Sequence, residues 1–579
     1  MSAKSPTSRK EREKWGTRHG PKKGKLVHCV NRDQEVGLRT IFGAKTKIMV
    51  QGKIRMRRTL SGSHNLRFLF ADLAVVGLCI VWAGAAHAQF APAQIGLNRI
   101  SSDPFYGPPG QHATEVEPHV LANGATLVAA FQTGRLPRPG SGAVAIGWST
   151  SANGGRTWTH GFLPGLTKKY RFGPYDAATD PVVAYDAKHG VWMIATLPLL
   201  NASPTTPVAV SRSTNGGFVW GNPVSVGPVD PNTPDKSWIV CDNWSTSKFY
   251  GNCYVEWDDF ASGEEILMST STDGGVSWGA ATPTTNTAGG YGGCPVVQKN
   301  GTVVVPILAD NAISVYTSTD GGQSWSAPAV VSPISWHTPA GGLRPSLFPS
   351  AAVDGAGSVY VVWADCSYRP GCIFDDSPLA ANDLVYSTST DGVNWSPVTR
   401  IPIDPTNSGV DHFIPGVAID PRTSGATAHV AVTFYYYSNS NCTATTCRLF
   451  VGSIFSSNGG TTWNPPVSLA GPMQLGWLPD SDGGLMVGDY IATTFVIESH
   501  PSRAGHYAAF AVAIAKSRTK FQEAILTSRY ISPDTVGPQL SSAGDRQMHH
   551  RSDKIKRVPE RGVAPPSGRA AKSSAKPSR

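Results

Sequence analysis

Charged residues are scarce in this chain of 579 residues, at 16% of the total. Long surface helices depend on charged side chains, so this scarcity excludes a helical bundle or a coiled coil. The chain is nevertheless too apolar, at 40%, for wholesale disorder. Its 61 glycines and 45 prolines predict many turns between short elements.

Several familiar catalytic signatures are also missing. The sequence contains no GxSxG elbow, no HExxH zinc motif, no Walker-type phosphate loop and no acidic loop with EF-hand spacing. It has no CxxC pair, which argues against a zinc ribbon or a thioredoxin-type site. We therefore expect no metal and no cofactor.

The net charge of +10 comes entirely from the two ends of the chain. Residues 1–67 carry 18 basic and 4 acidic side chains, residues 533–579 carry 10 and 4, and residues 68–532 carry 22 and 32. An acidic body repels a phosphate backbone, so we expect no nucleic-acid partner. The segment 533–579 has few large apolar residues, which predicts a disordered basic tail.

Residues 68–85 form an apolar run with arginines before it and a small-residue end, Ala86-His87-Ala88, after it. This pattern predicts a secretory signal over 56–88, and residues 1–55 are then interpreted as an over-long gene model. The alternative is an uncleaved anchor at 68–85, which is short for a membrane span and contains Asp72. We expect a secreted or periplasmic, cell-envelope protein that meets a membrane only through this segment.

Cysteine usage agrees with export, because spacing predicts three disulfide bonds that leave Cys294 unpaired. The expected pairs are Cys241/Cys253, Cys366/Cys372 and Cys442/Cys447.

One short motif recurs six times, with the form Ser-x-Asp/Asn-Gly-Gly-x-x-Trp and one shortened copy. Each copy follows a strand-like run and precedes an extended stretch with proline, so it predicts the turn of a β-hairpin. Asp or Asn accepts N–H groups of its own turn, and the glycines supply positive φ. The copies begin at Ser151, Ser213, Ser271, Ser318, Ser389 and Ser456.

A second, looser unit alternates with this motif and has two apolar strands, the first often opening with Pro-x-Val. Two strands here and two around each hairpin give a four-stranded sheet per repeat, which is the blade of a β-propeller. Seven copies begin near Glu117, Asp180, Asp235, Cys294, Pro349, His412 and Gly488.

The six-fold motif resembles the Asp box, or BNR repeat, of the sialidase superfamily of β-propellers, over roughly residues 110–530. The resemblance implies an all-β propeller of four-stranded blades over residues 89–532, with the Asp boxes in a structural role at the periphery. Sialidase propellers have six blades, whereas the seven two-strand units favour seven. A segment near Phe90–Ile100 would then supply the missing strand of the last blade.

The same resemblance implies three arginines that bind a carboxylate, a tyrosine nucleophile assisted by Glu, and an Asp acid/base. The family's Arg-Ile-Pro string is replaced here by Arg99-Ile100-Ser101, a departure that weakens the transfer of activity. The family's order can be followed as Arg99, Asp176 or Asp180, Glu256, Arg344, Arg448 and Tyr490.

A second set of candidates is independent of that template, because acidic and aromatic residues flank the inner two-strand units. In a propeller these positions cluster at the mouth of the central channel, and carboxylates beside aromatic rings suit sugar binding and glycosidic acid/base chemistry. The plainer alternative makes each Asp a turn former and Trp238 a core residue. Both sets together give catalytic candidates Tyr490, Glu256, Asp176 and Asp235, and substrate-binding candidates Arg99, Arg344, Arg448 and Trp238.

The resulting hypothesis is an exported, monomeric, sialidase-like glycoside hydrolase of the exo-sialidase type, acting on acidic sugars in a carbohydrate or glycoconjugate. The alternative is a non-catalytic propeller that binds a glycan or protein at its channel mouth. The two differ over the arginines: the sialidase hypothesis needs at least three of them in one mouth, from Arg99, Arg171, Arg344, Arg369 and Arg448.

Overall fold

The computed structural model describes residues 96–138, 141–201, 206–227, 233–372, 381–497, 505–518 and 520–528, and the backbone of residues 91–92. Contacts divide the chain into Met1–Ala83 and Gly84–Arg579, and all described residues belong to the second unit. The expected signal segment, the basic head and the tail 533–579 lie outside the described residues.

Within the described ranges, no helix is long and apolar enough to cross a membrane.

The described residues are all-β, as the sequence predicted, apart from four short 3-10 turns. Three sheets have four strands in the order in which the chain makes them. They consist of β11 (Pro234–Cys241), β12 (Cys253–Asp259), β13 (Glu265–Ser271) and β14 (Thr282–Pro283); β15 (Val296–Val297), β16 (Val303–Ala309), β17 (Ala312–Ser318) and β18 (Ala329–Pro333); and β19 (Ser350–Val353), β20 (Val359–Asp365), β21 (Asp383–Ser389) and β22 (Thr399–Arg400).

An eight-stranded sheet contains two further sets of four, which a single residue pair, Ala143 with Ala178, joins. One set is β3 (Gln111–Asn123), β4 (Thr126–Arg135), β5 (Ala143–Ser151) and β6 (Thr159–Phe162); the other is β7 (Ala177–Asp186), β8 (Val191–Leu199), β9 (Val208–Ser213) and β10 (Val224–Val226).

A five-stranded sheet adds the parallel strand β1 (Ala91–Pro92) to the edge of four antiparallel strands. Those four are β23 (Asp411–Ile419), β24 (Val430–Tyr437), β25 (Arg448–Ser456) and β26 (Val467–Gln474). Outside the large sheets there is a small hairpin, formed by β27 (Asp480–Ser481) and β28 (Gly484–Leu485). There are also four short turns: η1 (Phe260–Ser262), η2 (Ala340–Gly342), η3 (Gly425–Thr427) and η4 (Leu475–Trp477).

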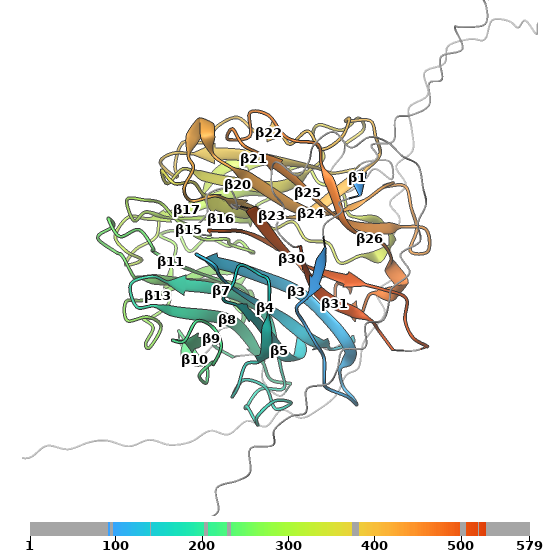
Figure 1. The fold of residues 1–579 in the computed structure, drawn as a ribbon. Helices are drawn as coiled ribbons and strands as arrows, with labels where there is room; N and C mark the ends of the chain where they lie inside the picture. The colour runs from blue at the N-terminus through green and yellow to red at the C-terminus, as the bar shows by residue number, and fades with distance from the viewer. Residues whose placement is uncertain are drawn as a thin grey trace, which may run out of the picture. The chain divides into compact units, whose positions relative to one another are not determined.

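The last sheet combines strands from both ends of the described chain. Strand β2 (Leu97–Arg99) pairs with β31 (Glu523–Ser528), which is followed by β30 (Gly505–Ala513) and β29 (Ala492–Val496). The prediction that a segment near residues 90–100 supplies the fourth strand of the last sheet is confirmed, because β2 is that strand. In Figure 1 the red strands β30 and β31 lie beside the blue strand β3, and contacts join both of them to β3.

The first strands of the seven four-strand sets contact one another in a closed cycle. Strand β3 contacts β7, β7 contacts β11, β11 contacts β15, β15 contacts β19, β19 contacts β23, β23 contacts β29, and β29 returns to β3. Side chains at the starts of these seven strands are therefore brought toward one another.

Each of the six repeated motifs connects the third and fourth strands of one set, beginning with the turn between β5 and β6. In the copy at Ser271, the hydroxyl donates to Asp273 at 2.9 Å and accepts the N–H of Gly275 at 2.9 Å. Asp273 also accepts the N–H of Ser277 at 3.0 Å. Gly275 has a φ of 76° and faces Met193 of the neighbouring set, which leaves no room for a side chain.

All three predicted disulfide bonds are present, which confirms the cysteine analysis. Cys241 and Cys253 join directly opposed positions of β11 and β12, and the other two bonds close short loops at Cys366–Cys372 and Cys442–Cys447. Cys294 is free and buried.

Candidate functional site

Four of the inner strands carry the same irregularity. The register shifts beside Glu117 in β3, Asp180 in β7, Lys236 in β11 and Ile414 in β23, and each of these residues has a φ between 50° and 56°. Positive φ is unfavourable for residues other than glycine, and such strain is found mainly where the surrounding structure enforces it. The bulges change the direction of single side chains at corresponding points of three neighbouring sets and of the set that contains β23.

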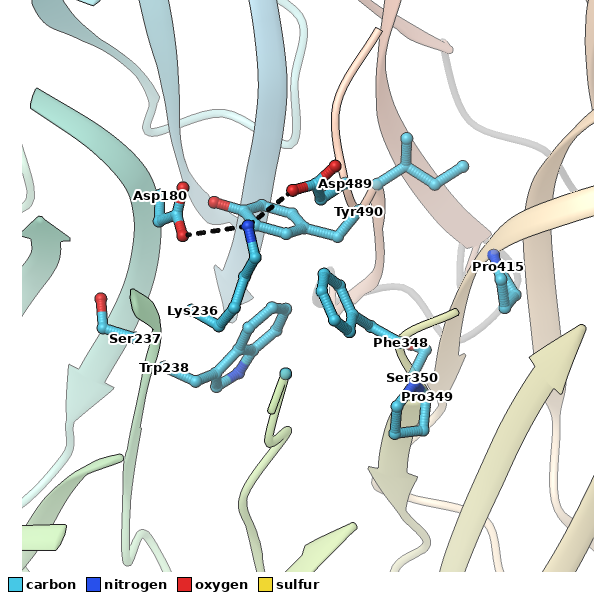
Figure 2. Close-up of a pocket in the computed structure, with 12 residues that line it drawn as sticks. Asp180, Lys236, Ser237, Trp238, Phe348, Pro349, Ser350, Pro415, Asp489 and Tyr490 are labelled. Carbon is cyan, nitrogen blue, oxygen red and sulfur yellow. Dashed lines mark hydrogen bonds and ion pairs between the residues drawn. The ribbon is translucent and has the colours of Figure 1, made fainter. Parts of the chain in front are cut away.

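A pocket lies where these strands meet. Its walls come from β7, β11, the start of β19 and the segment before β29 (Figure 2). The space encloses about 440 Å³, including the part that opens to solvent. The residues that line it are Asp180, Lys236, Ser237, Trp238, Gly292, Phe348, Pro349, Ser350, Pro415, Asp489, Tyr490 and Ile491.

The Lys236 amino group is the centre of the polar part of this pocket. Figure 2 shows it between Asp180 and Asp489, with Nζ at 2.7 Å from an Asp489 oxygen and 4.0 Å from Asp180. A third carboxyl, Asp235, lies 3.7 Å away. Arg344 binds Asp489 from the other side through two nitrogens, at 2.6 and 2.8 Å.

These contacts set the protonation of the site. Burial alone would raise the pKa of Asp489, but Lys236 and Arg344 hold it well below its usual range. Burial alone would lower the pKa of Lys236, yet the carboxylates of Asp489, Asp180 and Asp235 raise it well above its ordinary value. Ionised Asp489 and protonated Lys236 are therefore the stable forms at neutral pH.

Two other carboxyls of the site are shifted in the opposite direction. Burial, together with the charges of Asp180 and Asp489, raises the pKa of Glu117 to about 8, and Glu117 accepts the N–H of Asp489 at 3.1 Å. Burial also raises the pKa of Asp235, whose side chain is nevertheless 44% exposed. The site thus combines an ionised carboxylate with carboxyls that hold their protons to higher pH.

Aromatic rings form the apolar wall. The Trp238 ring makes edge contacts with His119 and Tyr490, each at a centroid distance of 5.2 Å, and Lys236 Nζ lies 5.4 Å from the centre of the Phe348 ring. Trp238 is partly exposed, so it belongs to the pocket as well as to the adjoining core.

Tyr490 and Glu256 do not form the predicted nucleophile and base. The Tyr490 hydroxyl is buried and donates to the carbonyl of Pro181 at 3.1 Å, and no hydrogen bond to a carboxylate is present for it among the described residues. Glu256 is completely buried beneath Gly293. In this structure the Tyr490 hydroxyl donates to a backbone carbonyl and not to Glu256, and its ring contributes to the packing and shape of the pocket.

The predicted arginines do not converge either. Of these predicted arginines, Arg344 alone belongs to the pocket network in the described part of the chain. The side chain of Arg99 contacts Glu115 at 3.6 Å and the carbonyl of Ser101, and Arg448 donates to the carbonyls of Thr445 and Cys447.

Asp176 also lies away from the pocket walls. It forms a 2.6 Å ion pair with Lys168 and accepts the N–H of Asn201. The alternative weighed for the same role, Asp180, is the one that lines the pocket.

Arg369 belongs to a separate buried cluster, where Asp383, Asp404 and His412 lie close enough to bind a metal ion. The guanidinium groups of Arg369 and Arg400 already fill that space. Arg369 contacts Asp383 at 2.5 Å and Asp404 at 2.9 Å, and Arg400 contacts them at 2.6 and 2.8 Å. This donor set fits a buried salt-bridge network.

Sequence reasoning missed Glu117 and Phe348. Each directly precedes a proline that lies within or just before an inner strand, as Asp180 precedes Pro181 and Ile414 precedes Pro415. The position directly before such a proline is therefore the sequence feature that could have identified Glu117 and Phe348 as candidate site residues.

No family model matches the chain, and no curated protein matches it. Several solved structures are similar to it, including sialidases, the superfamily that its motif resembles. One is the Hadza microbial sialidase Hz136, at 15% identity over 56% of this chain, with a TM-score of 0.37; the chain spans 64% of that protein's length.

Two further solved structures are similar at comparable levels. The NanB sialidase from Streptococcus pneumoniae is 13% identical over 76% of this chain and 71% of its own, with a TM-score of 0.37. The α-L-arabinofuranosidase Arb93A from Fusarium graminearum is 12% identical over 75% of this chain and 98% of its own, with a TM-score of 0.39.

Proposed function

We propose that this protein is an exported, seven-bladed β-propeller that binds an uncharged sugar unit of a glycan in the pocket around Lys236. The closed cycle of contacts among seven inner strands supports the blade number. Three disulfide bonds support export, because such bonds persist in oxidising compartments.

The observation that carries the proposal is the pairing of aromatic rings with polar groups in one pocket. Trp238 and Phe348 offer apolar faces for a sugar ring, and Asp180 offers carboxylate oxygens to its hydroxyl groups. Among the described residues, the cations of this network, Lys236, Arg344 and Arg135, each contact a carboxylate. An acidic sugar would have to compete with these carboxylates, which favours an uncharged unit.

Binding of the full chain to neutral and acidic oligosaccharides, measured by calorimetry, tests this function. Trp238→Ala should weaken binding of the neutral ligand about tenfold or more, because it removes the main stacking surface. Trp278→Ala is the matched control, since both rings are partly buried against the same core cluster but only Trp238 lines the pocket. Equal losses in the two variants, or binding of acidic sugars alone, would contradict the proposal.

Hydrolysis of a glycosidic bond is a second candidate function, favoured by Asp235. Its carboxyl is partly exposed and has a raised pKa, while Asp489 nearby stays ionised, which is the division expected of an acid and a charged partner. Fluorogenic neutral glycosides and a sialoside should be compared as substrates. We expect turnover of a neutral glycoside that Asp235→Asn abolishes and Asp176→Asn leaves unchanged.

The exo-sialidase alternative gives the opposite pattern in the same assay. It requires turnover of the sialoside and its loss in Asp176→Asn, Arg99→Gln and Arg448→Gln. These three side chains lie outside the pocket, so their removal separates the two hypotheses.

A further inference from the structure

Two loops that lead into β3 and β7, together with Phe162 at the end of β6, carry a group of aromatic side chains, here called the aromatic tip. Ring contacts join three of them, Phe105 to Phe162 at 4.8 Å and Phe162 to Tyr170 at 5.5 Å. The other two, Tyr106 and Phe172, are 85% and 97% exposed. Large aromatic side chains that extend this far into water are unusual on a surface with no partner.

Two cations flank these rings. Lys169 Nζ lies 5.9 Å from the centre of the Tyr106 ring and donates to the Tyr106 carbonyl at 2.9 Å, so it joins the two loops. The Arg171 guanidinium lies 5.4 Å from the centre of the Tyr170 ring. Neither cation pairs with a carboxylate in the described part of the chain. The aromatic tip therefore carries positive charge available to a ligand.

The loop holds Phe172 outward. Lys168 donates its N–H to Tyr175 at 2.7 Å, and Gly173 donates to Thr167 at 3.0 Å, which closes the loop at its base. Arg171 and Phe172 have φ values of 52° and 56°, and this local conformation directs the Phe172 ring away from the protein. The exposure is thus a property of a hydrogen-bonded loop.

We infer that the aromatic tip docks onto an anionic lipid surface, with Phe172 and Tyr106 in the interfacial layer and Lys169 and Arg171 against headgroups. A bilayer interface surrounds a protruding ring, whereas a polysaccharide covers only one of its faces, and Phe172 is exposed on nearly all sides. Basic side chains beside it are attracted to anionic headgroups. This inference does not depend on the sugar-binding proposal.

Docking in this way would orient the proposed pocket as well. The two loops lead directly into the strands that carry Glu117 and Asp180. The N-terminal ends of those strands would then face the lipid surface, where membrane-attached glycans are within reach.

The experiment places a polarity-sensitive fluorophore on the aromatic tip of the full chain. The label is attached to Phe172→Cys, and to Val219→Cys as a control on the exposed turn between β9 and β10, in a background of Cys29→Ser and Cys79→Ser. Vesicles contain equal parts of phosphatidylglycerol and phosphatidylcholine. We expect a blue shift at position 172 with these vesicles, none with phosphatidylcholine alone, and none at position 219.

The inference would be overturned if the fluorophore emission did not shift at position 172, or if it shifted equally at both positions. A shift at 172 with soluble polygalacturonate but not with vesicles would also overturn it, in favour of an acidic polysaccharide.

An unlabelled measurement keeps the test independent of the fluorophore. The double variant Lys169→Gln/Arg171→Gln should bind the anionic vesicles about 25-fold more weakly, from roughly fivefold for each cation. The control Lys248→Gln/Lys299→Gln removes the same charge from exposed positions elsewhere and keeps the same basic termini. Equal affinities for the two double variants would contradict the docking surface.

Discussion

Lys236 is central to the charge balance of the pocket. Three acidic side chains lie within 4.0 Å of its amino group. Without it, Asp180, Asp235 and Asp489 would face one another with Arg344 as their remaining charged partner at short range. Carboxylates that lose a buried partner either take up protons or repel, and both outcomes weaken the fold.

We expect Lys236→Met to lower the free energy of unfolding by about 3–5 kcal/mol, the range for breaking a buried ion pair by removing one partner. Urea unfolding followed by circular dichroism measures this change. Lys248→Met, at an exposed position, should stay within about 0.5 kcal/mol of the parent protein. A loss below 1 kcal/mol for Lys236→Met would show that the network does not support the fold.

Only some of the individual site residues could be predicted from the sequence. Asp235, Trp238 and Arg344 could be named because they stand beside inner strands, but the sequence could not tell which acidic residue faces the centre. Asp176 and Asp180 differ by four positions, and only the bulge at Asp180 turns its side chain into the pocket.

Tyr490 shows the same limit. Its partner is a backbone carbonyl of Pro181, 309 residues earlier in the chain. No spacing rule in the sequence reports a contact of that kind.

At the scale of elements, the six motif turns supply their own comparison, because three copies use Asp and three use Asn. Asn153 accepts the N–H of Thr157 at 2.9 Å in the same way as Asp273 accepts that of Ser277 at 3.0 Å. Both residue types therefore satisfy the turn, which is why the pattern could be recognised from sequence.

We expect Asp273→Asn to leave stability nearly unchanged at neutral pH and Asp273→Ala to cost about 1 kcal/mol, the usual net value of a lost turn hydrogen bond. Burial alone would raise the pKa of Asp273, but hydrogen bonds from Ser277, Ser271 and Val276 lower it to about 2. The contribution of Asp273 to stability should therefore be lost as pH falls from about 4 to 2, whereas the Asp273→Asn variant should keep its turn hydrogen bonds over that range. Urea unfolding at pH 7 and pH 3 measures both effects.

At the scale of the whole molecule, strand β2 joins the beginning of the described chain to its end. Ser101, just after β2, donates to Glu115 of β3 at 2.8 Å and accepts the N–H of Ile525 of β31 at 2.8 Å. The segment thus connects the first sheet to the last.

A chain that begins at Ser101 should therefore unfold at a temperature at least about 5 °C below one that begins at Gln89, because it lacks the fourth strand of its last sheet. Differential scanning calorimetry of the two chains measures this. A synthetic peptide of residues 89–100 should restore part of the difference. Equal unfolding temperatures would mean that the last sheet does not need β2.

Buried carboxyl groups with raised pKa values also make the stability of the whole molecule depend on pH. Burial raises the pKa of Glu115 to about 7, that of Glu117 to about 8 and that of Asp411 to about 7. In the unfolded chain these groups titrate near pH 4, so the folded protein binds more protons between pH 4 and 8. Unfolding free energy must then fall as pH rises through this window.

We expect the unfolding temperature to be highest near pH 5 and to decline steadily toward pH 8. Below about pH 4 the turn aspartates, such as Asp273, lose their contribution and stability falls again. Glu117→Gln should flatten the decline between pH 5 and 8, because a neutral amide has no proton to lose. Glu265→Gln, at a half-buried position outside the pocket, serves as the control, and identical slopes for the two variants would show that Glu117 is ionised in the folded protein.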